Sequence, residues 1–290
     1  MKKVEAFLVS SFTENGRGGN PAGVVLHADN LSNEEKLEIA KAVGYSETAF
    51  VSRDDEADFE LSFYTTTGEV DFCGHATLAA FSTLYKEGVL IEGQYIQRTK
   101  AGLLAVKVES GGHIVMEQKL PEYLGVLGYE TVSDFIGVDS AVLESTQLPI
   151  EVISTGLADI IVAVPRGYLD KIKVNERLLS DFCKKHNMIG VHAFELCEKD
   201  IELTASCRNF APLVGIPEES ATGSASGALA CYLTKHLKGA QSNYFTFEQG
   251  RAMGCVSRIT ATVETNEQDI TKVIVGGFAQ EIGRQEISIP

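Results

Sequence analysis

Two stretches of this chain stand out because apolar or small residues occupy most positions after a glycine. The first runs from Gly74 to Tyr85 and the second from Gly223 to Leu237. A helix that is apolar on all sides is buried rather than lying on a surface. Both stretches begin with small and polar residues, so each helix start offers backbone N–H groups that can bind an anion. Either stretch alone fits an ordinary core helix, but two in one chain favour a site that holds a small anion from two sides.

Alternating apolar and polar residues predict strands, and these strands follow the same order in both halves. Phe59, Leu61 and Phe63, for example, alternate with polar residues as in a half-buried strand. The matched segments are Glu47–Val51 with Val191–Leu196, Phe59–Ser62 with Ile201–Thr204, and Ala101–Ala105 with Gln249–Met253. The repeat indicates an internal duplication with a long period.

The duplicated order predicts an α+β fold of two pseudo-symmetric lobes. Each lobe is expected to be a curved, mostly antiparallel sheet or barrel around its central buried helix. The number of strands per helix is too high for a fold of parallel βαβ units. We expect the first lobe over residues 1–119, to which the C-terminal strand 277–290 can add, and the second over 120–276. The crossing is expected at Leu120–Glu122.

Local signals place further elements in the first half. Val4–Phe12 has the pattern of a strand, and Gly16–Gly23 is predicted to be a glycine-rich loop before the strand Val24–Leu26. That loop lacks the spacing of a P-loop or a dinucleotide fingerprint. Ser32 with Glu35 forms a capping box, and the helix that it opens is expected to end at Gly44.

Composition narrows the class of protein. The net charge of −15 argues against a nucleic-acid partner, which would need concentrated Lys and Arg. No apolar run is long enough to span a bilayer, and no export signal is visible, so we expect a cytoplasmic protein with no membrane partner. The six cysteines and six histidines show no metal-site spacing, so we expect free thiols and no bound metal.

Glu47 is the first candidate for chemistry. It follows the helix-ending Gly44 at the start of an apolar strand, where the second half has Val191. The fold therefore does not require a carboxylate at this position. A carboxylate in a dry pocket can exchange protons near neutral pH. On position alone, however, a strand-end glutamate in solvent is the better interpretation.

At this point the residues resemble a known family. Five segments occur in the order of the serial motifs of the PhzF-like isomerases of phenazine biosynthesis, which are relatives of diaminopimelate epimerase. Any one motif is weak, whereas five in order over nearly the whole chain are a strong signal. The segments are Gly19–Val24, Ser46–Val51, Cys73–Leu78, Phe210–Pro212 and Ala221–Ala225.

The resemblance implies a diaminopimelate epimerase-like fold with the site in the cleft between its lobes. It also implies proton transfer without a cofactor on a small anionic substrate, and a homodimer. Glu47 falls on the family's proton-shuttling glutamate. The remaining expected catalytic residues are His75 and Glu219, and the expected substrate-binding residues are Asn20, Ser46, Gly74, Thr222, Gly223 and Ser224. Backbone N–H groups at the two helix starts can stabilise the anion that forms when a carbon loses its proton.

The chain departs from the family at one position. The family usually has Asp-Pro where this chain has Glu219-Ser220. Because active sites are sensitive to misplacements of about 1 Å, this change makes the phenazine precursor an unexpected substrate. We therefore expect a different small amino or hydroxy carboxylic acid.

Other interpretations remain open for three features. Cys73 lies where the epimerases have one of two catalytic thiols, but no cysteine occurs from Glu219 to Ser226, so a buried structural role is favoured. His75 can cap its helix instead of acting on substrate, and Thr155-Gly156 can line the cleft or form a bulge. At the level of the whole protein, the alternatives are an amino-acid racemase or epimerase, and a binding protein that kept the fold but lost the chemistry.

Overall fold

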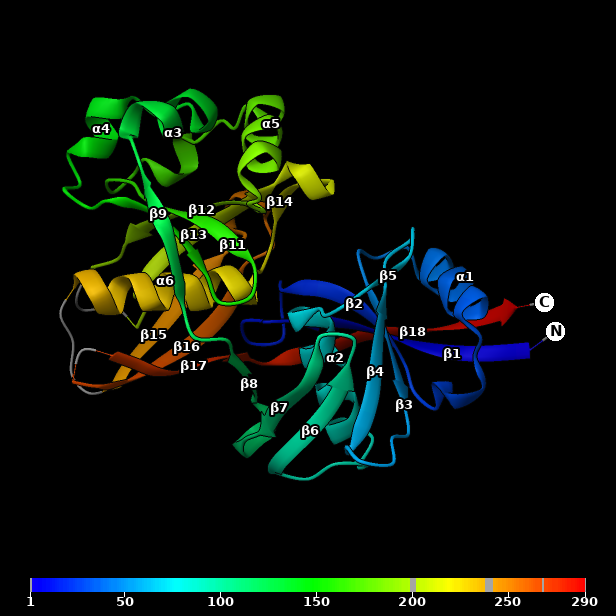
Figure 1. Cartoon of the computed structure of the whole chain (residues 1–290). Coiled ribbons are helices and arrows are strands. Elements are labelled where there is room, and N and C mark those ends of the chain that lie inside the picture. The colour runs from blue at the N-terminus through cyan, green and yellow to red at the C-terminus, as the bar shows by residue number, and fades with distance from the viewer. Residues whose placement is uncertain (1, 199–201, 238–241, 268, 290) are drawn as a thin grey trace. The chain divides into compact units, whose positions relative to one another are not determined.

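The computed structural model describes residues 2–198, 202–237, 242–267 and 269–289. The chain forms two compact units, one made of Met1–Glu117 with Gly276–Pro290 and the other of Gln118–Val275. The chain thus crosses between units after residues 117 and 275, where the sequence placed the crossings after 119 and 276. Figure 1 follows the chain through both units from blue to red.

The first unit contains one large sheet. Its strands are β1 (Lys2–Ser11), β2 (Asn20–Val25), β3 (Thr48–Ser52), β4 (Phe59–Tyr64), β5 (Glu69–Val70), β6 (Gly93–Thr99), β7 (Gly102–Val108), β8 (Ile114–Gln118) and β18 (Ala279–Ile289). They pair in the order β18-β1-β2-β3-β4-β6-β7-β8, with β5 as a short hairpin on β4. The pairs β2–β3 and β4–β6 are parallel and the others are antiparallel.

The central helix of the first unit is α2 (Gly74–Lys86), which lies against β1, β2, β3 and β18. Every residue from His75 to Leu84 is buried. A helix with apolar side chains on all sides is stable in water only when other elements bury all of those sides, as the strands do here. The buried helix predicted from Gly74 is therefore confirmed.

A second helix, α1 (Asn33–Val43), packs against the same sheet through Ile39 and Ala40. Its start has the predicted capping box, in which the Ser32 side chain accepts from the Glu35 N–H while the Glu35 side chain binds the Ser32 N–H. The helix ends before Gly44, which has the left-handed backbone that glycine adopts without strain. Both ends of α1 were readable from the sequence.

The second unit repeats this plan. Its strands are β9 (Glu122–Leu127), β10 (Ile150–Ser154), β11 (Ala158–Ala163), β12 (Gly190–Leu196), β13 (Ala205–Ala211), β14 (Ile216–Glu219), β15 (Ser242–Gln249), β16 (Ser257–Asn266) and β17 (Asp269–Gly277), the last of which runs on across the unit boundary. The pairing order is β9-β10-β11-β12-β13-β15-β16, with β14 on β13. As in the first unit, two pairs are parallel, β11–β12 and β13–β15.

The central helix of the second unit is α6 (Gly223–His236), which lies against β10, β11, β15 and β16. Residues Ala225–Leu233 are buried on all sides. The other face of the sheet packs against α3 (Tyr129–Ile136), α4 (Ser140–Glu144) and α5 (Glu176–His186). Figure 1 shows α6 as a yellow helix along the strands of its unit, with α3, α4 and α5 in green on another side.

The two units therefore share strand order, the placement of parallel pairs and a buried helix after the fifth matched strand. Within the described residues, short 3-10 turns complete the elements: η1 (Ala28–Asn30), η2 (Ser110–Gly112), η3 (Leu169–Lys171), η4 (Pro212–Val214) and η5 (Arg251–Met253). The predicted class, an α+β fold of two related and mostly antiparallel lobes, is confirmed.

Three local predictions were wrong. The strand matched at Ile201–Thr204 is displaced, because the strand begins at Ala205, where pairing with both β12 and β15 starts; residue 201 lies outside the described residues. The loop predicted to extend to Gly23 ends earlier, since Asn20 already opens β2. Pro21 is tolerated there because it precedes the β2–β3 pairing and need not donate toward β3. The match of Gln249–Met253 to Ala101–Ala105 also fails in structure, because Arg251–Met253 forms η5 where the first unit has the start of β7.

Candidate active site

Backbone contacts hold Glu47 at the start of β3. The Glu47 carbonyl accepts a hydrogen bond from the Gly23 N–H at 3.0 Å. A Cβ atom on Gly23 would lie 2.7 Å from Thr48 Oγ1 and 2.9 Å from Val43 Cγ1, so only glycine allows β2 to approach this closely. The glycine at this position therefore determines where the Glu47 backbone lies.

The side chains of Glu47, Cys73 and His75 meet at the start of α2. The Glu47 Oε2 and His75 Nε2 atoms are 3.3 Å apart, and Cys73 Sγ lies 3.4 Å from His75 Nδ1. The three side chains are largely withdrawn from solvent, with exposed fractions of 15% for Glu47, 7% for His75 and 9% for Cys73. Although the His75 ring is close, the contact does not meet the geometry of a hydrogen bond, and Glu47 Oε2 accepts none from the described residues.

The backbone of this helix start is held by neighbouring hydroxyl groups. The Ser11 hydroxyl donates to the His75 carbonyl at 2.6 Å, and the Thr77 hydroxyl donates to the Cys73 carbonyl at 2.9 Å. Asn20 is buried and lies directly opposite Ser11 in the β1–β2 ladder. The first turn of α2 is thus positioned by β1, with Asn20 one strand away.

Neither central helix has a side-chain cap. The N-cap side chains Ser32, Asp139 and Asn175 cap α1, α4 and α5, whereas those of α2 and α6, Cys73 and Thr222, make no capping hydrogen bond. Gly128 at the start of α3 has no side chain to offer. The first N–H groups of an uncapped helix carry a partial positive charge and can bind an anion or a developing oxyanion.

A network of four hydrogen bonds organises the turn before α6. The Thr222 hydroxyl donates to Glu219 Oε2 at 2.7 Å. The buried Gln249 side chain donates to the Glu219 carbonyl at 2.7 Å and to Thr222 Oγ1 at 3.0 Å, and its Oε1 accepts from the Thr222 N–H at 3.2 Å. Gln249, the last residue of β15, therefore fixes the backbone of Glu219 and the start of the helix, while Thr222 holds the Glu219 carboxylate.

Gln118 and Thr155 hold the first turn of α6 from another side. Gln118 Nε2 donates to the Gly223 carbonyl at 3.0 Å, and the Thr155 hydroxyl lies 2.7 Å from Gln118 Oε1 and 3.1 Å from the Ser224 carbonyl. A Cβ on Gly227 would lie 1.9 Å from Gln118 Oε1, so the glycine makes room for this side chain. Thr155 therefore helps to position the helix, and Gly156 lies in the turn between β10 and β11.

Comparison with known proteins identifies the family. The model of the PhzC-PhzF family, described as "Phenazine biosynthesis-like protein", matches residues 9–282. This chain belongs to the PhzC-PhzF family. An uncharacterized isomerase, YfhB, from Bacillus subtilis is 34% identical over 281 residues, covering 92% of each chain. A trans-2,3-dihydro-3-hydroxyanthranilate isomerase from Pseudomonas chlororaphis is 27% identical and covers 97% of this chain and 98% of its own.

A solved structure supports the same assignment. The Bacillus anthracis phenazine biosynthesis protein of the PhzF family has 29% sequence identity, a TM-score of 0.91 and full coverage of both chains. The resemblance and the fold expected from it are therefore confirmed. The enzyme class of this PhzF-family chain is isomerase, in agreement with the names of its relatives.

The structure groups the predicted site residues by unit. In the first unit, Glu47 and His75 are in contact at the uncapped helix start, Asn20 is buried one strand away, and Ser46 is exposed directly before Glu47. In the second unit, Glu219 contacts Thr222 beside Gly223 and Ser224. The roles assigned to these residues stay predictions.

Sequence reasoning missed the polar residues that support the second group, which are Gln118, Asp159, His192, Asn209 and Gln249. For Asp159 and His192, the available signal was a polar residue inside an apolar strand.

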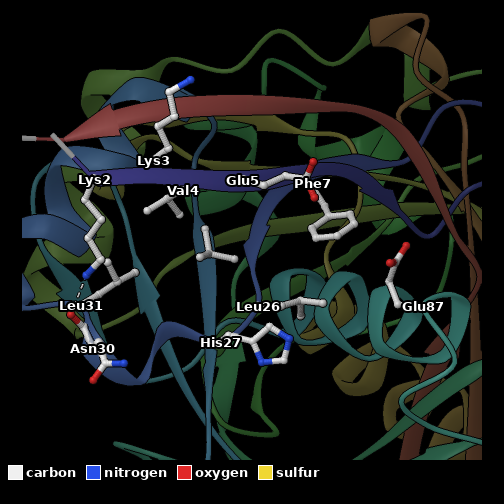
Figure 2. A pocket seen from close by; sticks show the side chains of 11 residues that line it. Lys2, Lys3, Val4, Glu5, Phe7, Leu26, His27, Asn30, Leu31 and Glu87 are labelled. Carbon is white, nitrogen blue, oxygen red and sulfur yellow. Dashed lines mark hydrogen bonds between the residues drawn. The ribbon is translucent and has the colours of Figure 1, made fainter.

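A pocket of about 390 Å³ in the first unit lies among β1, β2 and η1 rather than at the predicted site. Figure 2 shows its lining, which includes Lys2, Lys3, His27 and Glu87 but none of the predicted site residues. Lys2 donates to the Asn30 carbonyl, and Lys3 forms an ion pair with a glutamate of β18. Its two lysines are thus engaged within the unit, and we assign no chemistry to this pocket.

Glu47, Cys73 and His75 also form a set of metal-ligand types, since one donor atom from each lies within 4.8 Å of the others. Such donors suit Zn²⁺. The sequence gave no metal motif, so the expectation of a metal-free site stays a prediction, as does the homodimer. Among the described residues, no helix combines the length and apolar character needed to cross a membrane.

Proposed function

We propose that this PhzF-family isomerase moves a proton on a small amino or hydroxy carboxylic acid, with Glu47 as the acid and base. The observation that carries the proposal is the state of Glu47 Oε2, which is withdrawn from solvent, lies 3.3 Å from His75 Nε2 and accepts no hydrogen bond from the described residues. A buried carboxylate oxygen without a partner is costly for the fold. Its retention beside an uncapped helix start supports a role with substrate.

The proposed reaction balances without a co-reactant. The Glu47 carboxylate takes a proton from a carbon next to an electron-withdrawing group and becomes a carboxylic acid. The electron pair of the broken C–H bond delocalises into an anion, which N–H groups at the start of α2 can stabilise. Glu47 then returns the proton to another carbon of the same molecule. Because no electrons leave the substrate, the step needs no redox partner.

A substrate-binding role is also proposed for the start of α6 in the second unit. Thr222, Gly223 and Ser224 are partly exposed there, and the Glu219 side chain is held beside them by Thr222. The helix start offers N–H groups for a carboxylate of the substrate, and Glu219 offers an acceptor for a hydroxyl or amino group. Such a pair suits an amino or hydroxy acid, which carries both kinds of group.

The substrate is proposed to differ from that of the Pseudomonas chlororaphis relative, which is named for trans-2,3-dihydro-3-hydroxyanthranilate. The reason is the Glu219-Ser220 pair in place of the Asp-Pro usual in the family. Glu219 extends one methylene further, and its carboxylate is already engaged by Thr222. A substrate group of another length is therefore expected to meet it.

The test is solvent-deuterium exchange. Purified protein is incubated in D₂O with a panel of small amino and hydroxy acids, and uptake at carbon is measured by mass spectrometry. Panel members are chosen by thermal shift, because a ligand that binds the folded state raises its apparent stability. Catalysed uptake that persists with chelator present and without added pyridoxal phosphate or nicotinamide is expected. Binding of panel members without any exchange would identify a binding protein instead, and dependence on an added cofactor or metal would contradict the mechanism.

A further inference from the structure

Polar side chains form a row across four strands of the second unit, from β11 to β14. The ladder pairs Ile161 with His192, His192 with Asn209, and Asn209 with Glu219. Residues directly opposite each other point to the same face of a sheet, and residues two apart in one strand do as well. Asp159, two residues before Ile161, therefore shares the face of Glu219.

That face is the one toward α6. The residues that alternate with the row, such as Ile160, Val191 and Phe210, belong to the apolar cluster with α3 and α5 on the other face. α6 packs against β10 and β11 from the remaining side. The row thus runs beneath the central helix and ends at the turn that begins this helix.

The row is deeply buried. Asp159 and Asn209 are each 1% exposed and His192 is fully buried. Asn209 is the link, since its Nδ2 lies 3.3 Å from His192 Nδ1 and its side chain also hydrogen-bonds to Asp159. Asp159 Oδ1 and His192 Nε2 have no hydrogen-bond partner among the described residues. A charged carboxylate in such surroundings is strongly disfavoured, because burial removes the charge from bulk water.

Burial and the ionisable groups around Asp159 determine the pKa of its carboxyl. Burial raises the pKa of the Asp159 carboxyl to about 7, and the negative charge of Glu219 acts in the same direction against a smaller opposing effect of Asn209. Burial lowers the pKa of His192 to about 3, so this ring is neutral near pH 7 and offers no positive charge. On α5, the pKa of the Cys183 thiol is raised to about 11, chiefly by burial, so it is uncharged as well.

The remaining elements around Asp159 add no charge near the start of α6. Residues 223–230 of the helix carry no ionisable side chain. Glu151 on β10 forms ion pairs with Lys235 and His236 in the last turn of the helix. Glu219 is therefore the one described group whose charge bears directly on Asp159 from the helix start.

We propose that Asp159 is a positioning residue for Glu219: it stores a proton behind the start of α6, so that Glu219 alone is charged where substrate binds. The inference rests on the proposed function in assigning substrate contact to Glu219. Loss of the stored proton would place a second negative charge beneath an anion-binding helix start. An anionic substrate would then bind more weakly, which gives the site an upper pH limit that is set by a residue out of reach of the substrate.

One arm of the test needs no substrate. The carboxyl carbons of ¹³C-labelled aspartate are titrated by NMR, and the Asp159 resonance is identified by its absence in Asp159→Asn. The expected midpoint is about 7 in the parent, and it is expected to fall in Glu219→Gln because the like charge is removed. A midpoint in the ordinary range for aspartate, or one that does not respond to Glu219→Gln, would overturn the inference whether or not the proposed function holds.

The other arm uses activity. Isomerisation of trans-2,3-dihydro-3-hydroxyanthranilate, the substrate named for the Pseudomonas relative, is followed at high enzyme concentration from pH 5.5 to 8.5. In the parent, KM is expected to rise by about tenfold per pH unit above the midpoint, since the protonated form binds. In Asp159→Asn, which cannot ionise, this rise is expected to vanish. An identical rise in the variant would overturn the inference while leaving Glu47 chemistry intact. If the parent turns over neither this probe nor any other acid tested, the result counts against the proposed function. The NMR titration then decides the inference about Asp159 by itself.

Discussion

Glu47 Oε2 and His75 Nε2 lie 3.3 Å apart, although three strands of the first unit, β3, β4 and β5, separate them along the chain. The contact brings Glu47 Oε2, which accepts no hydrogen bond from the described residues, to the uncapped start of the buried helix. Proton transfer at carbon needs a base next to a group that stabilises the resulting anion. In the proposed mechanism, Glu47 is this base and the N–H groups at the start of α2, where His75 lies, stabilise the anion.

Replacing Glu47 by glutamine is expected to abolish proton transfer while leaving the fold intact. The amide keeps the shape of the side chain but cannot accept the proton, and a general base contributes about 10²–10⁴-fold to rate. Deuterium uptake should fall by about that factor, with the melting temperature within a few degrees of the parent. Glu92→Gln, at an exposed position of the same unit, serves as the control and should exchange normally. Full activity of Glu47→Gln would refute the mechanism.

Replacing Cys73 by serine separates the one-base mechanism from that of the two-thiol epimerases. Cys73 is 3.4 Å from His75 Nδ1 but is interpreted as a structural neighbour. Deuterium uptake by Cys73→Ser is therefore expected within a few fold of the parent. Loss of exchange comparable to that of Glu47→Gln would favour a thiol as the acid or base, and the amino-acid epimerase interpretation would then take precedence.

Restoring the family's Asp-Pro pair is expected to shift substrate preference. The double variant Glu219→Asp/Ser220→Pro shortens the carboxylate that Thr222 now holds and stiffens the turn before α6. Trace activity on trans-2,3-dihydro-3-hydroxyanthranilate should rise relative to the parent, measured as kcat/KM. Efficient turnover of this compound by the parent would show that the substitution does not control selectivity. If the double variant gains nothing, selectivity lies elsewhere, and the residues around Thr155 are the next to test.

Gly227→Ala is expected to destabilise the second unit. The added Cβ would lie 1.9 Å from Gln118 Oε1, so Gln118 must leave its hydrogen bonds with Gly223 and Thr155. Each of these partly buried hydrogen bonds contributes about 1 kcal/mol to stability. The matched control is Gly74→Ala, where the nearest atom to an added Cβ is Phe72 Cε1 at 3.9 Å. Denaturant unfolding should show the loss only for Gly227→Ala; equal stability of both variants would contradict the role of Gln118.

Asp159 and His192 are expected to change stability in opposite directions with pH. The raised pKa of Asp159, about 7 against 3.8, means that the folded state gains stability from its proton at low pH and loses it as pH rises from about 4 to 7. The lowered pKa of His192, about 3 against 6.5, means that stability is lost as pH falls from about 6.5 to 3. In one protein the two effects oppose each other.

Single variants separate these effects. Relative to Asp159→Asn, the free energy of unfolding of the parent should decline from pH 4 to 7. Relative to His192→Gln, it should increase over nearly the same range. Differences between parent and variant cancel the titration of all other groups, which makes chemical denaturation at several pH values sufficient. A pH-independent difference for either variant would show that the corresponding group titrates alike in the folded and unfolded states.

The sequence by itself determined the local elements and the family. Both ends of α1 were predicted because capping involves residues three or four apart, and α2 and α6 were predicted because their apolar positions leave no polar side. The ordered motifs located Glu47 and Glu219. Capping residues and apolar helix patterns are short-range signals, and the family motifs are recognised by their order along the chain. All of them can therefore be read without knowing which strands pair.

Only the tertiary structure decided where strands begin and which polar residues meet. The start of β13 at Ala205 depends on pairing with the preceding strand β12 and with β15, which is distant in sequence. The row from Asp159 to Glu219 exists because four strands align in one register, and a shift of one residue would turn Asn209 to the other face. Likewise, Gln118 reaches Gly223 only because Gly227 leaves room. Register and close packing are long-range properties, and the pattern of apolar and polar residues along the chain does not specify them.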